Sequence, residues 1–431
     1  MRIYNNPTKQ NWDALCKRPV MEQKELNSVV SKILGNIRLN GDDALLKYTK
    51  SFEGVQLKQF KVEAAELTFS ENKISDELKN AIDIAYQNIY SFHQNQVDSS
   101  PSIETSPGIK CWRKSTGIER VGIYIPAGEA PLFSTVLMLG IPAQIAKCKK
   151  VVLCTPVQKD GSVNATILYA AKRVGIKEIY KIGGAQAIGA MAYGTNSIPK
   201  VDKIYGPGNQ YVTKAKEIIQ QQGVAIDLPA GPSEILVVAD DTAKPDFIAA
   251  DLLSQAEHGT DSQAMLVCTN EAIVKEVNSQ LNKQLNELPR KKIIEKALQN
   301  SKAIVLKNTD LCIDFSNYYA PEHLIIATKS SENEAEKIVN AGSVFLGNYS
   351  CESAGDYATG TNHTLPTNGY AKNYSGVSLD SFTKKITFQK ISKKGLLNIG
   401  ETVELMAQAE QLEAHKNAVS IRLKSIYNEQ T

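Results

Sequence analysis

The sequence predicts an α/β protein with two tandem Rossmann-like domains, each an incomplete parallel sheet, together with a small N-terminal arm and a C-terminal hairpin and helix segment. Short apolar runs alternate with segments of helical spacing from about residue 121, and glycines follow several of these runs. A second block with the same alternation begins after residue 233. Strand–helix alternation with glycine turns favours right-handed βαβ units, which build parallel sheets.

Helical patterns dominate the chain before residue 110. Residues 1–19 are predicted to form an irregular arm with room for one short helix. The apolar spacing from Glu22 to Ile37 predicts a helix that stops near Gly41. A further helix begins after Ser75, a typical N-cap. His93 is expected at the exposed C-terminal end of that helix, where a cation is mildly favourable, so we assign it a structural role.

Each alternating block contributes its own strands and helices. The first has predicted strands at 121–126, 151–154, 178–182 and 203–205, and predicted helices at 134–147, 164–173, 186–191 and 209–221. The second has predicted strands at 264–268, 303–306, 324–327 and 343–346, and helices at 246–258, 271–285 and 331–340, the last with a capping box at Ser331 and Glu334. Residues 349–378 are predicted to be a functional loop, 382–391 a hairpin and 402–424 a helix.

Length and composition are typical of a soluble globular protein. The chain has 431 residues, of which 42% are hydrophobic and 22% charged, and its small net charge of +3 gives no support for binding nucleic acid or an anionic membrane. The N-terminus lacks an apolar core, and prolines interrupt the most apolar stretch at 121–148, so we expect neither a signal peptide nor a membrane span. The seven cysteines have no CxxC spacing and are expected to be reduced thiols of a cytoplasmic protein.

Glu322 and His323 are the first candidate catalytic pair. Pro321 suits the first position of a helical turn, and the apolar run from Leu324 to Ala327 predicts a strand. One helical turn before a strand would present the two side chains about 100° apart, toward one pocket. A carboxylate beside an imidazole is a usable acid–base set near neutral pH. A solvated turn is the alternative if no other residues converge here.

The histidines suggest a metal site. Only five occur, so most of them can belong to one site. Gln255 and His258 lie three positions apart on a predicted helix and share a face, although His258 could instead be a buried core histidine. His258, His415 and a carboxylate form a plausible nitrogen and oxygen set for zinc. Asp356 and His363 are ambiguous when taken singly.

Glu410 and His415 pose a geometric problem. They lie five residues apart on one predicted helix, so they would point about 140° away from each other. If both serve one site, the helix must break between them. Otherwise only one of them belongs to the site.

Two glycine runs could bind a nucleotide. Gly183-Gly184 and Gly206-Pro207-Gly208 each end a predicted strand and start a helix, so each could offer backbone N–H groups to a phosphate. The same glycines could simply make tight turns, and the Gly-x-Gly-x-x-Gly run of dinucleotide sites is absent. Ser233, in the turn between the two blocks, is either a local cap or a ligand-binding hydroxyl.

Taken together, eight runs of residues closely resemble the histidinol dehydrogenase family. They are residues 122–126, 130–135, 183–187, 206–209, 229–234, 251–259, 319–323 and 414–418. The resemblance covers nearly the whole chain and is highly specific in combination. It implies the last step of histidine biosynthesis, in which L-histidinol and two NAD give L-histidine through bound histidinaldehyde.

The resemblance implies a role for each site residue. Zinc, one ion per subunit, would be held by Gln255, His258, Asp356 and His415. The substrate would be contacted by Ser233, Gln255, His258, His323, Asp356, His363, Glu410 and His415. NAD would be contacted by Tyr124, Gln186 and Asn209. His323 would take the hydroxyl proton of the substrate, and Glu322 would activate water on the aldehyde.

The resemblance also implies the domains and the assembly. Residues 1–19 would be the arm, residues 20–123 and 233–377 the first Rossmann-like domain, and residues 124–232 the second, which contacts NAD. Residues 378–431 would be a dimerisation segment that completes the site of the partner in an intertwined homodimer. Glu410 and His415 would then not need to reach the pocket of their own chain.

Two other classes of function remain open from the residues alone. A zinc hydrolase could use Glu322 to activate a metal-bound water. A non-catalytic metabolite-binding protein is the third possibility. Two adjacent acid–base residues in one turn speak against it.

Overall fold

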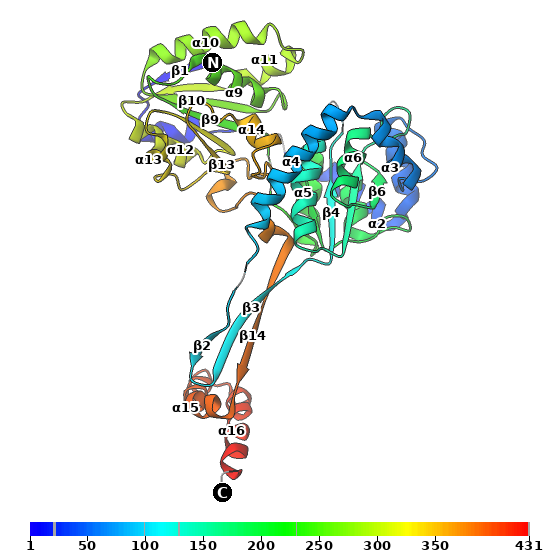
Figure 1. Cartoon of the computed structure of the whole chain (residues 1–431), viewed down its shortest axis with the longest axis vertical. Helices are drawn as coiled ribbons and strands as arrows, with labels where there is room; N and C mark the ends of the chain where they lie inside the picture. The colour runs from blue at the N-terminus through cyan, green and yellow to red at the C-terminus, as the bar shows by residue number, and fades with distance from the viewer. Residues whose placement is uncertain (20–22, 99, 128–129, 230, 430–431) are drawn as a thin grey trace. The chain divides into compact units, whose positions relative to one another are not determined.

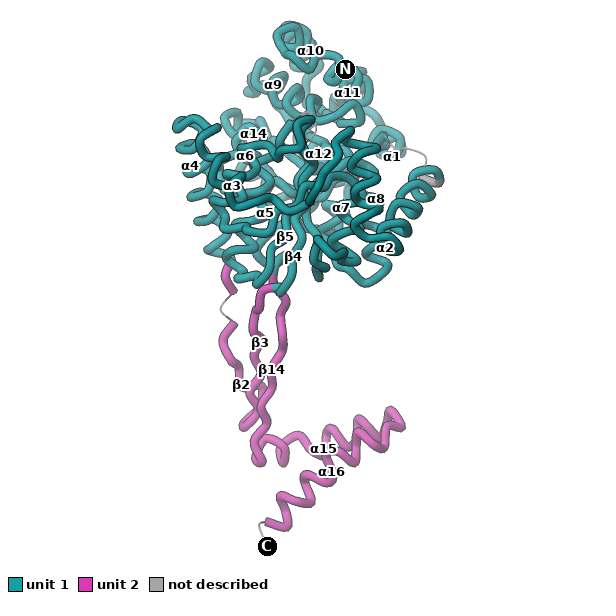
Figure 2. The backbone as a smooth tube through the Cα atoms, turned by 90° about the vertical axis from the view of Figure 1, so that its right-hand side faces the viewer, with its two compact units in different colours: residues 1–96, 118–382 teal, residues 97–117, 383–431 magenta. Residues whose placement is uncertain are grey.

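The computed structural model describes residues 1–19, 23–98, 100–127, 130–229 and 231–429. Figure 1 shows the course of the chain, and Figure 2 colours its two compact units, residues 1–96 with 118–382 and residues 97–117 with 383–431. The first unit contains two parallel sheets, so the predicted α/β class is confirmed. Ala230, in the predicted turn at 229–233, lies outside the described residues.

One sheet has five parallel strands in the order β6-β5-β4-β7-β8. The strands are β4 (Arg120–Tyr124), β5 (Lys150–Thr155), β6 (Glu178–Lys181), β7 (Lys203–Tyr205) and β8 (Ala225–Ile226). The helices between them are α5 (Phe133–Ile145), α6 (Ala165–Arg173), α7 (Gly184–Tyr193) and α8 (Gln210–Gln221). The chain runs outward from β4 through β5 and β6 and then returns to β7 on the other side of β4. A topological switch point therefore lies beside β4.

Helices from the start of the chain cover this sheet. They are α2 (Gln23–Glu53), α3 (Ala64–Ser70) and α4 (Asp76–Gln94), with the 3-10 helix η2 (Glu71–Lys73) between the last two. α2 breaks at Gly41, as predicted. Ile89 of α4 shares a core with Ile123, and Leu34 of α2 shares one with Tyr124. These helices thus pack with residues 120–226, whereas the prediction grouped residues 20–123 with 233–377. The predicted boundaries of the two Rossmann-like domains therefore stay a prediction.

The other sheet has six parallel strands in the order β1-β11-β10-β9-β12-β13. The strands are β1 (Arg2–Asn5), β9 (Glu234–Ala239), β10 (Gln263–Cys268), β11 (Lys302–Val305), β12 (His323–Ala327) and β13 (Ser343–Leu346). The helices are α1 (Trp12–Leu15), α9 (Pro245–Ala256), α10 (Glu271–Leu285), α11 (Lys291–Gln299), α12 (Thr309–Tyr319), α13 (Ser331–Ala335) and α14 (Glu352–Tyr357), with the 3-10 helices η1 (Lys9–Asn11), η3 (Tyr370–Lys372) and η4 (Leu379–Phe382).

Both faces of the six-stranded sheet are covered. Ile235 and Val237 of β9 enter a core that includes residues of α9, α10 and α11, and the alternate residues Leu236 and Val238 enter a core that includes residues of α12 (Figure 1). Every residue of β9 and β10 is buried, as expected for parallel strands between two helical layers.

Two predictions about the approach to this sheet are wrong. The arm is not irregular, because β1 pairs in parallel with β11 at the sheet edge. The segment before His323 is not a helical turn either. Ala320 ends α12 in the left-handed conformation (φ 55°), so Pro321 and Glu322 lie outside any helix and β12 begins at His323.

Two predictions after residue 330 also need correction. α13 is shorter than the predicted 331–340 helix, and no capping box forms, because Glu334 accepts a hydrogen bond from Thr328 Oγ1 instead of reaching back to Ser331. The predicted loop at 349–378 contains the short helix α14, which carries Glu352 and Asp356.

The second unit has three antiparallel strands and two helices. The elements are β2 (Ile103–Ser106), β3 (Ile109–Gly117), β14 (Thr383–Ile391), α15 (Lys393–Ala409) and α16 (Glu413–Asn428). The predicted hairpin at 382–391 is wrong, because these residues form one strand that pairs with β3 along its whole length. The predicted helix at 402–424 is interrupted, since Gln411 has a positive φ of 59°. Glu410 and His415 therefore lie on different helices.

All seven cysteines are free thiols, as the sequence predicts. Within the described ranges, no helix is both long and apolar enough to cross a membrane.

His93 is buried, contrary to the prediction of an exposed helix end. Its Nδ1 lies 2.8 Å from the carbonyl oxygen of Ile89, so Nδ1 carries the hydrogen and donates. Its Nε2 lies 3.4 Å from the amide nitrogen of Asn362, which also donates to the carbonyl of Met138. His93 thus ties α4 to the segment before His363, and burial lowers its pKa.

We predict that His93→Gln makes the protein less sensitive to acid. A histidine with a lowered folded-state pKa stabilises the fold above its unfolded pKa, near 6.5, and this contribution is lost as pH falls below that value. The loss is at most about 1.4 kcal/mol per pH unit for one proton. Thermal unfolding from about pH 7.5 to about pH 5.5 should show a smaller decline for the variant than for the wild type. Equal declines would contradict the assignment.

We predict that Gly206→Ala is strongly destabilising, by about 4 kcal/mol or more. Gly206 has a φ of 123°, and a Cβ there would lie 2.0 Å from the carbonyl oxygen of Tyr124. Gly223→Ala is the matched control, because Gly223 also has a positive φ (93°) but no heavy atom within 4 Å of a Cβ. Its cost should be only about 1–2 kcal/mol. Urea unfolding midpoints compare the two, and similar losses would refute the steric argument.

Candidate active site

The predicted catalytic pair lies at the amino ends of β9 and β12. These strands pair in parallel, with His323 opposite Ile235. Glu322 Oε2 accepts a hydrogen bond of 2.9 Å from the backbone N–H of Glu234, the first residue of β9. Ligands of open α/β sheets usually bind at the carboxyl edge. Here α9 runs back along β9, so its C-terminal end brings further polar residues to the amino edge.

Glu322 and His323 face each other in a buried environment. The Glu322 Oε2 to His323 Nδ1 distance is 3.6 Å, and both side chains are more than nine-tenths buried. His323 Nδ1 also lies 3.4 Å from the carbonyl oxygen of Glu234, and His323 Nε2 lies 3.5 Å from Asp356 Oδ1. Burial raises the pKa of Glu322 to about 8. Burial lowers the pKa of His323, but the Glu322 and Asp356 carboxylates outweigh it and hold this pKa above its ordinary value.

Next to this pair is a group of residues that could hold a metal ion. One ligand atom from each of His258, Glu352 and Asp356 lies within 4.8 Å of the others. Burial raises the pKa of Glu352 to about 7. Burial also opposes ionisation of Asp356, but the imidazoles of His323, His363 and His258 outweigh it and lower the pKa of Asp356. Two adjacent carboxylates and an imidazole are a donor set that suits zinc, and a cation would relieve the repulsion between the carboxylates.

Gln255 lies beside this group in the last turn of α9. Its amide is fully buried. In the orientation that satisfies both amide atoms, the nitrogen donates to Glu352 Oε1 (2.9 Å) and the oxygen accepts from the backbone N–H of Glu234 (3.0 Å). His258 follows the end of the helix and its side chain reaches solvent, so it is not a residue of the hydrophobic core, although the atoms packed around its ring lower its pKa by burial.

Both ring nitrogens of His363 have hydrogen-bond partners, so this residue positions the group and offers no free nitrogen to a metal ion. Its Nδ1 lies 2.8 Å from the carbonyl oxygen of Asp356, so Nδ1 must carry the hydrogen. Its Nε2 lies 3.0 Å from Thr135 Oγ1 and, in the neutral ring, accepts the hydroxyl hydrogen. Burial lowers the pKa of His363, which favours this neutral form.

Three other predicted substrate contacts are Ser233, Glu410 and His415. Ser233 is half-buried and directly precedes β9. Glu410 is the C-cap of α15, and His415 lies in the first turn of α16. Both are exposed within the second unit, so the first unit by itself brings together Gln255, His258, His323, Asp356 and His363 but neither of these two.

The three residues predicted to contact NAD lie at the carboxyl edge of the five-stranded sheet. Tyr124 ends β4, Gln186 is in the first turn of α7, and Asn209 is the N-cap of α8. This is the switch point of the sheet, where nucleotides usually bind.

The glycine runs at this edge are better explained as tight turns than as phosphate sites. The N–H of Gly184 donates to Tyr124 Oη, and the N–H of Gly183 donates to Glu53 (both 3.1 Å). The N–H of Gly206 donates to Asp227 Oδ2 (2.8 Å). These N–H groups therefore already have partners inside the chain.

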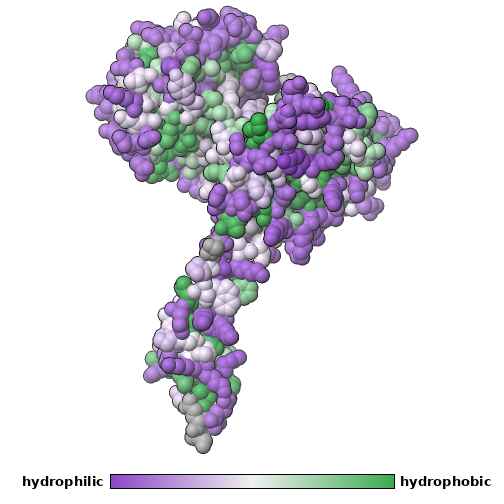
Figure 3. All heavy atoms as spheres, in the orientation of Figure 1, coloured by the Kyte–Doolittle hydropathy of each residue, from purple (hydrophilic) through white to green (hydrophobic). Residues whose placement is uncertain are grey.

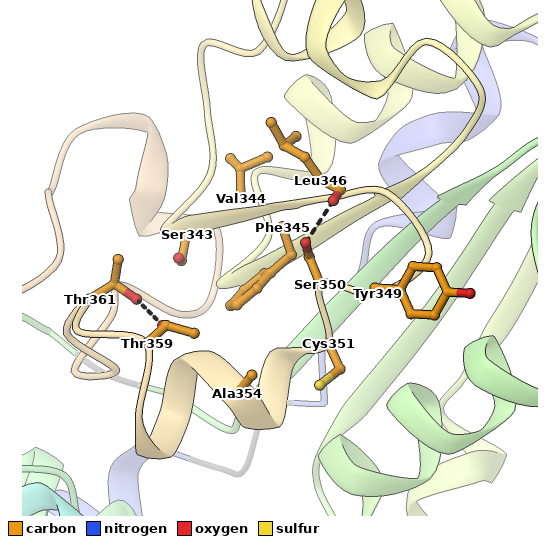
Figure 4. Close-up of a pocket in the computed structure, with 10 residues that line it drawn as sticks. All are labelled: Ser343, Val344, Phe345, Leu346, Tyr349, Ser350, Cys351, Ala354, Thr359 and Thr361. Carbon is orange, nitrogen blue, oxygen red and sulfur yellow. Dashed lines mark hydrogen bonds between the residues drawn. The ribbon is translucent and has the colours of Figure 1, made fainter. Parts of the chain in front are cut away.

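A hollow of about 350 Å³ opens beside α14 and β13. Figure 4 shows Phe345 of β13 and Ala354 of α14 among its lining residues. None of the lining residues is a predicted site residue. The ring of Phe345 lies 6.1 Å from that of His323, so the hollow adjoins the site through this side chain.

Sequence reasoning missed Glu352 and Thr135. Glu352 lies four residues before Asp356, and this spacing places both on one face of a helix. The prediction of a loop at residues 349–378 gave no reason to look for this helical spacing. Thr135 belongs to a run that resembles the family, but only the fold places its hydroxyl next to His363.

Comparisons with known proteins identify the family of this chain. The family model described as histidinol dehydrogenase matches residues 16–423. The chain is 54% identical over 426 residues to a histidinol dehydrogenase of Bacteroides thetaiotaomicron, with 99% of this chain and 100% of that protein covered. It is 51% identical to the chloroplastic histidinol dehydrogenase of Arabidopsis thaliana, with 96% and 89% covered. It matches the crystal structure of histidinol dehydrogenase from Elizabethkingia anophelis at 58% identity, with a TM-score of 0.97 and 99% of both chains covered. This chain therefore belongs to the histidinol dehydrogenase family.

Proposed function

We propose that this protein oxidises L-histidinol to L-histidine through histidinaldehyde, with one zinc ion per subunit and two NAD. The observation that carries the proposal is the contact of the Glu322–His323 pair with the His258, Glu352 and Asp356 group. A base pair and a cation site at the same sheet edge allow one substrate to be held and deprotonated in place.

The roles of the pair follow from the two half-reactions. Bound zinc would hold the substrate nitrogens, and each NAD would accept one hydride. In the first half-reaction, His323 in its neutral form takes the proton of the substrate hydroxyl. A cation bound at Asp356 would offset the carboxylate charge that raises the pKa of His323. In the second, Glu322 takes a proton from water as the water oxygen adds to the aldehyde carbon. The enclosure of both side chains keeps bulk water from competing for these protons.

We propose Gln255, His258, Asp356 and His415 as the zinc ligands, with Glu352 beside them. The Gln255 amide has two orientations here: one directs its oxygen toward Glu352, where it could bind zinc, and the other directs its nitrogen there as a donor to Glu352 Oε1. The substrate would meet Ser233, His323, His363 and Glu410, as well as the zinc ligands. NAD would meet Tyr124, Gln186 and Asn209.

We propose a homodimer in which residues 378–431 complete the partner's site. Large apolar side chains on α15 and α16 support this, because Leu405, Met406, Ile421 and Tyr427 are each more than half exposed. Figure 3 colours hydrophobic residues green and hydrophilic residues purple over one face of the molecule. We place the reaction in the cytoplasm, where free thiols such as the seven of this chain persist.

The two alternative classes receive less support. Family membership favours the oxidoreductase over a zinc hydrolase. A non-catalytic binding protein gives no reason for a buried carboxylate whose pKa is raised toward neutrality beside an imidazole. Purified protein with histidinol, NAD and zinc should produce NADH at two per histidinol consumed. Absence of NADH would refute the proposal.

We predict that Glu322→Gln slows aldehyde oxidation by about 100-fold or more while affecting alcohol oxidation far less, because only the second step needs an activated water. Rapid-mixing measurements that start from histidinol or from histidinaldehyde separate the steps. His323→Gln is the matched control and should impair alcohol oxidation. Equal loss of both steps in Glu322→Gln would contradict the assigned role.

We predict that Asp356→Asn lowers zinc affinity by about 100-fold, because the amide removes the charge that a divalent cation neutralises. Calorimetric titration of chelator-treated protein with zinc measures this without an activity assay. Asp261→Asn is the control, because Asp261 is an exposed carboxylate shortly after His258. Unchanged affinity in Asp356→Asn would exclude Asp356 as a ligand.

A further inference from the structure

Arg18, near the end of the N-terminal arm, is anchored beside the active site. Its Nε and Nη2 lie 2.5 Å and 3.1 Å from the two carboxylate oxygens of Glu234, so the pair is bidentate. Nη2 also donates to the carbonyl oxygen of Tyr319 (2.7 Å) and lies 3.4 Å from that of Ala320. The Tyr319 ring lies 4.0 Å from the guanidinium carbon. The side chains of Arg18 and Glu234 are only 12% and 2% exposed.

These partners are the backbone segments that hold the catalytic pair. Glu234 donates its N–H to Glu322 Oε2, and its carbonyl oxygen faces Nδ1 of His323. Tyr319 and Ala320 form the turn that leads into β12, and Ala320 is held in the left-handed conformation that non-glycine residues rarely adopt. One guanidinium therefore joins the start of β9 to the turn before β12.

We propose that Arg18 is a positioning residue for Glu322 and His323. It touches neither side chain and acts through Glu234 and the Tyr319–Ala320 turn. The inference rests on the proposed function, because histidinol oxidation defines the task of the pair. A displacement of about 1 Å at a reacting group can slow a reaction by about 100-fold, so a clamp on both supporting segments affects the rate directly.

A simple tethering role for Arg18 is less well supported, because the arm has other attachments. β1 pairs with β11. Lys302 donates to the carbonyl oxygens of Leu15 and Lys17, and Lys9 forms an ion pair with Asp314 of α12 (3.0 Å). The arm would remain on the sheet without Arg18. The start of β9 and the turn before β12 would lose the guanidinium between them and keep the hydrogen bond from Tyr319 Oη to Glu234 Oε2 (2.9 Å) and the β9–β12 pairing.

The test compares Arg18→Met and Arg18→Lys with the control Lys9→Met in the full-length, zinc-loaded enzyme. Lysine keeps the charge but lacks the planar fork that reaches both Glu234 oxygens and the Tyr319 carbonyl. We expect kcat of both oxidation steps to fall by about 10- to 100-fold in Arg18→Met and by less in Arg18→Lys, with KM for histidinol within about threefold of wild type. Hydrogen–deuterium exchange of residues 319–326 should be faster in both Arg18 variants and unchanged in Lys9→Met.

Three results would overturn the inference. They are wild-type kcat and exchange in a folded Arg18 variant, a rise in KM without a fall in kcat, and equal effects in Lys9→Met. If Arg18→Met does not fold, Arg18→Lys decides by the same criteria. If the wild-type protein itself does not reduce NAD with histidinol, the proposed function fails, and the exchange of residues 319–326 still decides whether Arg18 holds this segment.

Discussion

The candidate active site depends on the parallel pairing of β12 with β9. The register sets His323 opposite Ile235 and brings Glu322 to the backbone N–H of Glu234. A slip of one residue would turn His323 to the opposite face of the sheet. The buried residues of β9 and β12 enter cores on both faces, so hydrophobic packing far from the chemistry fixes this register.

The pairing also concentrates charge in a place with little water. Glu322 and Glu352 are buried carboxylates with raised pKa values, and Asp356 is kept ionised by the imidazoles around it. Glu234 would add a further unpaired charge if Arg18 did not neutralise it. This cluster of buried carboxylates destabilises the folded state when it has no cationic partner, because a buried carboxylate without a partner is poorly solvated. The requirement for function explains why these residues stand together.

The proposed functional residues of the two sheets in the first unit lie at opposite edges of their sheets. The residues proposed to contact NAD lie at the carboxyl edge of the five-stranded sheet, whereas the proposed catalytic pair lies at the amino edge of the six-stranded sheet. Thr135 of α5 and His363 provide one direct link between elements of the two sheets, since His363 contacts both the Thr135 hydroxyl and the Asp356 carbonyl. This link sets the ring nitrogen that carries the proton, and it orients the backbone of a proposed metal ligand.

The sequence by itself determined the elements with strong local patterns and indicated Glu322 and His323 as an acid–base pair, and the family resemblance added a role for each of the two. Apolar runs and glycine turns depend on local backbone preference and burial, which neighbouring residues encode. Only the tertiary structure decided the partners. The alternation of apolar and polar residues along β14 indicates a strand but does not indicate that the strand pairs with β3. Likewise, no residue near Arg18 in the chain indicates that Arg18 pairs with Glu234. Contacts between distant segments arise from the packing of the whole unit, and no local pattern records them.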